Sequence, residues 1–359
     1  MVFFYVDNLS AKLIFGGSNS GCGLCNKSII CQSNPSFMEL KEEIVKKVLL
    51  LQQKYAAMGQ DLESYLDGLL HADYLTYWDY IHLDTLLSLQ TPRTSFPDEE
   101  IFIMYHQITE LYFKLTLHEM EQIVAHKELT GKFMTARLKR VNSYFQALTT
   151  SFEIMVNGME REQFLKFRMS LLPASGFQSA QYRLIEIYST HFRNLVQAES
   201  REKYASDYSE KDLVEMYEDI YWKKGATELS SGKKTLTLNQ FEEKYTETLL
   251  GTAERCYRAN ILHCYTVLPE SEKADLDLIT QLKWLDVNVN INWPLSHYKS
   301  AVKYLQKNPV DIAATGGTNW QKYLPPRFQK RIFFPDIWSE QEKEDWGKSW
   351  VEEILHQTN

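Results

Sequence analysis

The chain has 359 residues, of which 44% are hydrophobic and 24% charged, and its formal net charge is −8. These proportions are typical of a globular protein with a sizeable core. We do not expect nucleic acid or an anionic membrane as a partner, because such binding depends on clustered Lys and Arg and the sequence has no basic block. No apolar run reaches the roughly 18 residues of a membrane span, so we expect a soluble protein.

The five cysteines form no repeated spacing, and their odd number argues against a disulfide framework. This usage favours a reducing compartment, and we therefore predict a cytoplasmic location. The one CxxC pair has no second pair of ligands nearby, as a structural zinc site would require. The cysteines are Cys22, Cys25, Cys31, Cys256 and Cys264.

Residues 1–37 differ in character from the rest of the chain. MVFFYVDNLSAKLIF has a single Lys and no small-residue cleavage pattern, which makes it a poor secretory signal, and GGSNSGCGLCNKS reads as a flexible linker. We predict a disordered or misassigned extension over residues 1–37, followed by one domain over 38–359.

Helical periodicity dominates from Met38 onward. Apolar residues three or four apart, among them Leu40, Ile44 and Val48, predict an amphipathic helix. Asp98 is expected to cap a second, central helix that runs to Val124. No segment alternates with period two for long enough to form a sheet, so the predicted fold class is all-α. Further helices are expected over 136–155, 179–188, 212–221, 240–268 and 271–305, with a variable insertion over 193–234.

An arginine and a loop suggest a site for a small anion. Arg168 lies in the mostly apolar segment FLKFRMS, where a cation is costly unless it meets an anion, most simply a carboxylate. The sequence LPASGFQSAQYR follows at Leu172–Arg183. Its Pro, Ser and Gly predict a backbone loop that precedes a helix.

Two histidines lie on predicted apolar helices. His106, in IFIMYHQITELYFK, has Glu110 one turn away. His297 follows Pro294 and Ser296, which suits a helix start, and its neutral imidazole could bind iron axially. The alternative for both is a packed histidine with a satisfied ring.

Other chemistries lack their local patterns. Only Glu353 to His356 has the Glu-x-x-His spacing of di-iron bundles, and no HExxH, GxSxG or GxxxxGK[ST] occurs. The segment AATGGTNW contains Thr315 to Gly317, small residues that could approach a ligand closely or could form a plain turn.

Four blocks of the sequence, in this order, resemble the tryptophan 2,3-dioxygenase family: TYWDYIHLDTLLSLQTP, DEEIFIMYHQITELYFKL, FRMSLLPASGFQSAQYR and TGG. The patterns SGFQSxQxR and FxxxHQxxELxxK are the most specific. The resemblance implies an all-α fold, haem b (iron protoporphyrin IX) as cofactor, a homotetramer, and insertion of both atoms of O₂ into the indole C2–C3 bond of L-tryptophan to give N-formylkynurenine.

The resemblance also implies roles for particular residues. His297 corresponds to the proximal haem ligand, and His106 to the distal histidine that hydrogen-bonds the indole N–H. Phe102 corresponds to the aromatic that packs on the indole ring, and Arg168 to the clamp on the substrate carboxylate. The remaining correspondences are Thr315 at the ammonium and carboxylate end, Ser175 and Gly176 lining the haem and oxygen pocket, and Tyr77, Tyr80 and Ile81 in a segment that enters a neighbouring subunit's pocket.

The sequence departs from the family pattern at three places. Phe164 replaces a tyrosine of some members that would hydrogen-bond the substrate carboxylate, Thr318–Trp320 replaces two serines and a glycine, and Pro294 replaces an arginine. Two other functions therefore stay open. One is a related haem oxygenase acting on another aromatic amino acid or indole derivative, and the other is a non-catalytic haem-binding homologue.

Overall fold

The computed structural model describes residues 2–7, 10–15, 38–39, 41–73, 75–171, 178–204, 208–227, 233–305 and 330–347. Contacts between residues divide the chain into two compact units, Met1–Leu87 and Ser88–Asn359. We call them unit 1 and unit 2 and describe each by itself. This division lies well beyond the boundary at residue 37 that the sequence suggested, and the single domain over 38–359 stays a prediction.

Unit 1 begins with a small antiparallel sheet of strand order β2-β1-β3. Val2 pairs with Phe15 and Asp7 with Ser10, which makes β1 and β2 a hairpin. The disordered or misassigned extension expected over residues 1–37 stays a prediction, and Cys22, Cys25 and Cys31 lie outside the described residues. The strands are β1 (Val2–Asp7), β2 (Ser10–Phe15) and β3 (Met38–Glu39).

The helices of unit 1 bury none of their described residues. The side chains of Leu50 and Leu70 are 64% and 76% exposed, and Tyr80 on the third helix is 75% exposed. Apolar surface on this scale is costly to leave in water. The helices are α1 (Glu42–Ala57), α2 (Leu62–Leu70), α3 (Tyr77–Tyr80) and α4 (Leu83–Leu87).

The centre of unit 2 is the long helix α5 (Asp98–Ala125). Its first turn is acidic, with Asp98, Glu99 and Glu100, and is therefore stabilised by the helix dipole. The predicted capping role of Asp98 is wrong, because the N-cap is Pro97 and no side-chain cap is present. The Asp98 carboxylate instead accepts a hydrogen bond from the backbone N–H of Glu160, and so ties the start of α5 to the loop before α8.

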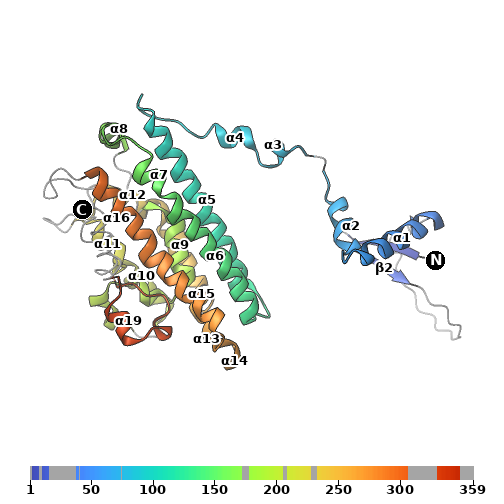
Figure 1. Cartoon of the computed structure of the whole chain (residues 1–359). Helices are drawn as coiled ribbons and strands as arrows, with labels where there is room; N and C mark the ends of the chain where they lie inside the picture. Colours follow the sequence, from blue (N-terminus) through green and yellow to red (C-terminus); the bar gives the residue numbers. More distant parts are fainter. Residues whose placement is uncertain are drawn as a thin grey trace, which may run out of the picture. The chain divides into compact units, whose positions relative to one another are not determined.

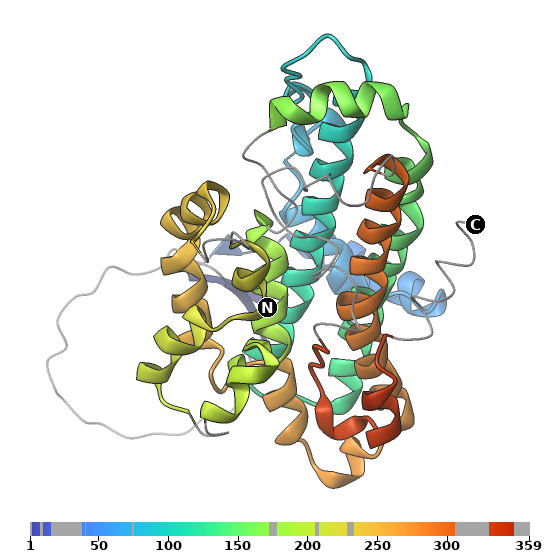
Figure 2. The same cartoon turned by 90° about the vertical axis from the view of Figure 1, so that its left-hand side faces the viewer.

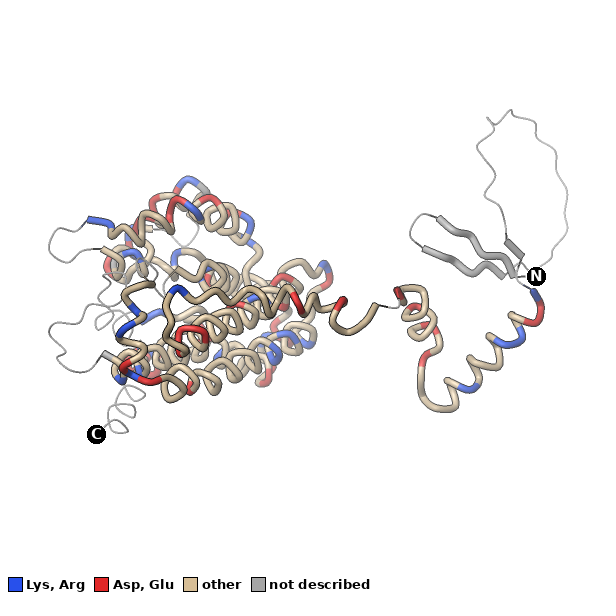
Figure 3. Tube along the Cα trace, turned by 90° about the horizontal axis from the view of Figure 1, so that it is seen from above, with Lys and Arg blue, Asp and Glu red and all other residues tan. Residues whose placement is uncertain are grey.

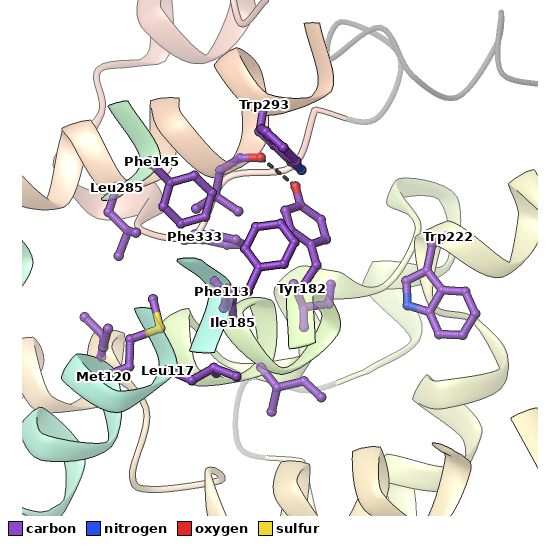
Figure 4. Close-up of a cluster of buried hydrophobic side chains, with 14 of the residues drawn as sticks. Phe113, Leu117, Met120, Phe145, Tyr182, Ile185, Trp222, Leu285, Trp293 and Phe333 are labelled. Atoms are coloured by element: carbon purple, nitrogen blue, oxygen red, sulfur yellow. Dashed lines mark hydrogen bonds between the residues drawn. The ribbon is translucent and has the colours of Figure 1, made fainter. Parts of the chain in front are cut away.

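Four helices meet around one part of the core of unit 2. Helix α5 packs against α6 (Gly131–Ser151) and α9 (Ala180–Ser189), and α6 packs in turn against α15 (Leu276–Val287). Figures 1 and 2 show α5, α6 and the α15–α16 segment running side by side. Phe113, Phe145 and Leu285 are almost fully buried where these helices meet (Figure 4).

Two long helices expected from the sequence are divided in the structure. The segment 240–268 forms α12 and α13, and Asn260, whose side chain accepts from the His263 N–H, caps the second. The segment 271–305 contains a π-helical turn, so His297 does not lie at a helix start. The other elements of unit 2 are α7 (Glu153–Asn157), α8 (Arg161–Phe167), η1 (Arg168–Leu171), η3 (Phe192–Leu195), η4 (Ala198–Lys203), α10 (Glu210–Glu218), α11 (Tyr221–Gly225), α12 (Leu236–Arg255), α13 (Ile261–Thr266), α14 (Glu270–Lys273), η5 (Asn288–Asn292), α16 (Trp293–Leu305), η6 (Pro335–Ile337) and α19 (Glu340–Glu344).

The predicted all-α class is confirmed for unit 2, where the described residues form helices and two isolated β-bridges. Basic and acidic residues are interspersed along these helices (Figure 3). In the part of the chain that the structure describes, no helix combines the length and apolar character needed to cross a lipid bilayer.

Candidate functional site

Helix α5 presents Phe102 and His106 on one face, because residues four apart are neighbours on an α-helix. The two ring centroids lie 4.1 Å apart. His106 Nδ1 lies 2.7 Å from the carbonyl oxygen of Phe102. A carbonyl can only accept, so Nδ1 carries the proton and Nε2 is left as an acceptor in the neutral ring.

The environment of His106 is neither core nor open surface. Its side chain is exposed, yet surrounding protein lowers its pKa through desolvation. Glu110, the partner that the sequence suggested, instead accepts a hydrogen bond from Gln181 Nε2 at 2.8 Å.

Helix α8 and the 3₁₀ turn after it supply the next residues. Phe102 contacts Phe167 with ring centroids 5.8 Å apart and Phe164 at 6.4 Å. Arg168 directly follows, and only 9% of it is exposed. Burial lowers the pKa of its guanidinium, which is the expected effect of removing a cation from water. The predicted burial of Arg168 is thus confirmed, in the 3₁₀ turn that directly follows the helix packed against Phe102.

Helix α16 carries His297, whose ring is packed between two aromatic side chains. Phe152 and Trp293 each lie 4.6 Å from it, measured between ring centroids. Nδ1 of His297 lies 3.1 Å from the Trp293 carbonyl oxygen. Burial lowers the pKa of His297 to about 4, so the imidazole is neutral at pH 7 and its Nε2 lone pair is available.

The two histidines are connected through aromatic contacts. Tyr105 lies next to His106 on α5 and contacts Phe152, with centroids 5.7 Å apart, and Phe152 contacts His297. Charge on His106 also lowers the pKa of His297, which requires the two rings to lie near each other. The structure therefore brings together two histidines that are far apart in the sequence.

Helix α16 also reaches the arginine-bearing segment. Tyr304, on the same helix as His297, packs on Phe164 with centroids 4.9 Å apart. Its hydroxyl donates to the carbonyl oxygens of Val156 and Met159, at 3.0 and 3.1 Å. Helices α5, α8 and α16 thus enclose one region, and each contributes one of the predicted site residues Phe102, Phe164 and His297.

Six of the predicted site residues are not placed at this region. Ser175, Gly176 and Thr315 lie outside the described residues. Tyr77, Tyr80 and Ile81 belong to α3 of unit 1 and its C-cap. No group of three or more His, Cys, Asp and Glu side chains with the arrangement of a metal site occurs among the residues that the structure describes.

Sequence reasoning missed residues that surround His297. Phe152 and Trp293 were not singled out, because an aromatic residue on a helix is usually core. The run NVNIN at Asn288–Asn292 was a usable signal, since three asparagines within an apolar helical stretch are unfavourable there. The structure shows that this run forms the π-helical turn η5.

The family model and the curated relatives that match this chain all name the same family. The family model described as tryptophan 2,3-dioxygenase matches residues 69–257, just over half of the chain. This range contains Phe102, His106 and Arg168, and it ends before His297.

Curated relatives carry the same name. The tryptophan 2,3-dioxygenase of Bacillus thuringiensis subsp. konkukian (strain 97-27) is 29% identical over 283 residues, which cover 75% of this chain and 94% of the relative. That of Herpetosiphon aurantiacus is 28% identical over 273 residues, 74% of this chain and 96% of the relative. That of Ruegeria sp. (strain TM1040) is 41% identical over 119 residues, and this match spans only 41% of the relative's length.

Proposed function

The chain belongs to the tryptophan 2,3-dioxygenase family, and we propose that it catalyses the reaction for which the family is named. In that reaction both atoms of O₂ enter L-tryptophan, the indole C2–C3 bond breaks, and N-formylkynurenine is the product. The atoms balance without an external reductant. The observation that carries the proposal is the convergence of His106, His297 and the Arg168 segment, which come from three separate parts of the chain.

The family depends on haem, and the residues around His297 fit such a group. Axial ligation of haem iron requires a neutral imidazole with one free ring nitrogen. His297 meets both requirements, because burial lowers its pKa to about 4 and the Trp293 carbonyl fixes the proton on Nδ1. A hydrogen bond on the second nitrogen also orients the ring and raises ligand basicity.

We propose haem b, held through His297, as the specific cofactor. When bound, this group supplies the binding and activation of O₂. The chain's own residues then have the tasks of binding the amino acid, orienting the indole and excluding water.

Arg168 is proposed to bind the substrate carboxylate. A buried guanidinium gains most from a bidentate carboxylate, because its desolvation is then offset by charge-assisted hydrogen bonds. Its position directly after Phe167, which contacts Phe102, supports binding of the carboxylate end of the substrate beside these aromatic rings.

Phe102 and His106 are proposed to orient the indole. The Phe102 ring offers an apolar face for stacking, and stacked rings prefer centroid separations of about 4.5 to 7 Å. His106 holds its proton on Nδ1 towards Phe102, so Nε2 is free to accept the indole N–H. The lowered pKa of His106 keeps this acceptor available near neutral pH.

The remaining predicted residues complete this proposal. Ser175 and Gly176 would line the haem and oxygen pocket, and Thr315 would bind the ammonium and carboxylate end of the substrate. Tyr77, Tyr80 and Ile81 would enter a neighbouring subunit's site in a homotetramer. The exposed apolar side chains of unit 1 support assembly, since they leave a large area that a partner chain could cover.

The cytoplasmic location predicted from the cysteine usage stays a prediction. The proposed function involves neither a nucleic acid nor a membrane.

Product analysis tests the proposed function. The full-length protein is purified with added haemin, reduced, and incubated with L-tryptophan and O₂, and the product is identified by mass spectrometry. We expect N-formylkynurenine, with both added oxygen atoms derived from ¹⁸O₂. A product with one labelled oxygen would instead indicate a hydroxylating enzyme. Haem binding through His297 without any product would indicate a non-catalytic homologue.

A further inference from the structure

The segment that leads to His297 contains an unusual turn. Helix α15 continues through η5 into α16, and the Trp293 N–H donates to the Asn288 carbonyl five residues earlier. Such π-turns are rare in proteins and occur often at functional sites. Each extra residue in a helix rotates everything after it by about 100°. The direction of the His297 ring relative to α15 therefore depends on this turn.

Buried side chains hold the turn in place. Asn290, which is 3% exposed, donates from Nδ2 to Asp286 Oδ1 at 2.6 Å. Its Oδ1 accepts a hydrogen bond from Arg331 Nε. Both polar ends of the Asn290 side chain are thus satisfied by groups outside the turn, which fixes the side chain and the backbone that carries it.

The backbone of the turn has an anchor of its own. The hydroxyl of Tyr182, on α9, donates to the Val289 carbonyl oxygen at 2.7 Å. Figure 4 shows this hydrogen bond, with the Trp293 ring close to Tyr182. Arg331 Nη2 donates to the same Tyr182 hydroxyl at 3.2 Å, so the two anchors belong to one network.

The network extends into two other segments. Asp286, which is fully buried, accepts from the backbone N–H groups of Phe333 and Phe334 at 2.9 and 3.1 Å and from Trp338 Nε1 at 3.0 Å. Arg331 Nη1 pairs with Glu186 Oε1 on α9 at 2.6 Å. One hydrogen-bonded network therefore joins polar groups of α9, of the turn and of residues 331–338.

A contribution to the free energy of unfolding is by itself a poor explanation for such a buried polar network. Buried ion pairs are often no more stabilising than apolar residues of the same volume, because desolvation offsets the attraction between the charges. A network that specifies one conformation of a rare turn has a clearer physical role. We propose that Asp286, Asn290 and Arg331 are positioning residues for His297, which hold the π-turn and so set the direction in which α16 presents the imidazole. This inference rests on the proposed function, because it is the proposed role of His297 as haem ligand that makes the direction of its imidazole matter.

Hydrogen exchange tests the inference without haem. In Asn290→Ala the amides of Trp293 and of residues 295–297 should exchange roughly 5- to 150-fold faster, since a lost buried hydrogen bond costs about 1 to 3 kcal/mol; Pro294 has no amide proton. The matched control is Glu119→Gln, which breaks a buried carboxylate–arginine cluster between Glu119 on α5 and Arg137 and Arg140 on α6. These three side chains belong neither to the turn nor to the network described above. Unchanged exchange at 293–297 in Asn290→Ala, or an equal change in Glu119→Gln, would overturn the inference.

Spectroscopy of the haem-loaded protein gives the second readout. Resonance Raman of the ferrous form measures the iron–histidine stretching frequency, which responds to the direction of the imidazole. We expect a shifted frequency with haem retained in Asn290→Ala, and the wild-type frequency in Glu119→Gln. Asn290→Ser, which keeps a donor and an acceptor, should lie between them, and it replaces Asn290→Ala if that variant does not fold.

Failure of this inference can be told apart from failure of the proposed function. A wild-type protein without histidine-ligated haem contradicts the proposed function, and the exchange data still decide whether Asn290 holds the turn. A wild-type protein with that ligation, and an unchanged stretching frequency in a folded Asn290→Ala, contradicts only the positioning role.

Discussion

The carbonyl oxygen of Trp293 lies 3.1 Å from Nδ1 of His297, one helical turn later on α16. This contact selects one tautomer of the imidazole, because a carbonyl can only accept and Nδ1 must therefore be protonated. The lone pair then lies on Nε2. The packing of Phe152 against the same ring leaves the imidazole little freedom to rotate.

The first prediction concerns the loss of this imidazole. His297→Gly should abolish haem retention in the purified protein, and added imidazole should restore a Soret band by entering the space left by the side chain. The matched control is His118→Gly, because His118 is an exposed histidine on α5 and the change carries a similar glycine cost of about 1 kcal/mol. Unchanged haem content in His297→Gly would place the ligand on another residue.

The second prediction concerns Arg168. Arg168→Met should lower kcat/KM for L-tryptophan by roughly 10- to 150-fold, since a charge-assisted hydrogen bond contributes about 1.5 to 3 kcal/mol. It should change kcat/KM little for tryptamine, which lacks the carboxylate. Steady-state kinetics on both substrates provides the measurement. Lys166→Met removes an exposed cation from the last turn of α8, two residues before Arg168, and serves as control. Equal losses on both substrates would remove the carboxylate-binding role.

The third prediction separates two roles of Phe102. Its ring packs on Phe164 and Phe167, so Phe102→Ala should lower the free energy of unfolding by about 2 to 3 kcal/mol, somewhat less than for a fully buried ring. Phe102→Leu should recover most of this stability while still raising KM for L-tryptophan, because a leucine cannot stack on the indole. Urea unfolding and kinetics measure the two effects. A wild-type KM in Phe102→Leu would leave Phe102 with a packing role alone.

The central helix and the residues on it could be predicted from the sequence. Apolar residues surround most of α5, and this pattern predicts a central helix. One side of α5 is buried, while Met104, Ile108, Leu111 and Leu115 on the other side are 40 to 49% exposed. The spacing of Phe102 and His106 then places both on one face. Arg168 could also be predicted, since an arginine within an apolar segment is buried when that segment packs.

The asparagines of Asn288–Asn292 signal an irregularity before His297, but the geometry of the π-turn there could not be predicted. Its geometry depends on Arg331, 41 residues after Asn290, and on Tyr182, 107 residues before Val289. Local periodicity carries no information about such distant partners. The wrong capping role of Asp98 has the same cause, because its carboxylate binds the Glu160 N–H, 62 residues away.

The fourth prediction is a pH dependence of stability. Burial raises the pKa of Asp286 from 3.8 to about 6 in the folded protein. The folded state therefore binds more protons than the unfolded state between these values, so this group stabilises most at low pH and its contribution is lost as pH rises through about 6. The stability difference between wild type and Asp286→Asn should accordingly fall, on the order of 1 to 3 kcal/mol, between about pH 4 and pH 6.

A second aspartate on α15 provides a control of opposite sign. A hydrogen bond from Lys139 lowers the pKa of Asp277, so its contribution is present above its unfolded pKa and is lost as pH falls. Urea unfolding of Asp286→Asn and Asp277→Asn should therefore show the contribution of Asp286 falling as pH rises between about pH 4 and pH 6, and that of Asp277 falling as pH drops below about pH 4. A contribution of Asp286 that falls as pH drops, as that of Asp277 does, would show that the burial of Asp286 does not control its protonation.

The fifth prediction concerns the thiols of unit 2. Burial raises the pKa of Cys256 to about 12 and that of Cys264 to about 11, so the reactive thiolate is scarce at pH 8. Iodoacetamide should label both residues at least roughly a hundredfold more slowly in the native protein than in urea, where the pKa returns to about 8.5. Cys264 should react before Cys256, because it lines a surface hollow of about 320 Å³ beside His263 and Arg258. Peptide mass spectrometry resolves the two sites, and rapid native labelling of Cys256 would contradict its position in the core.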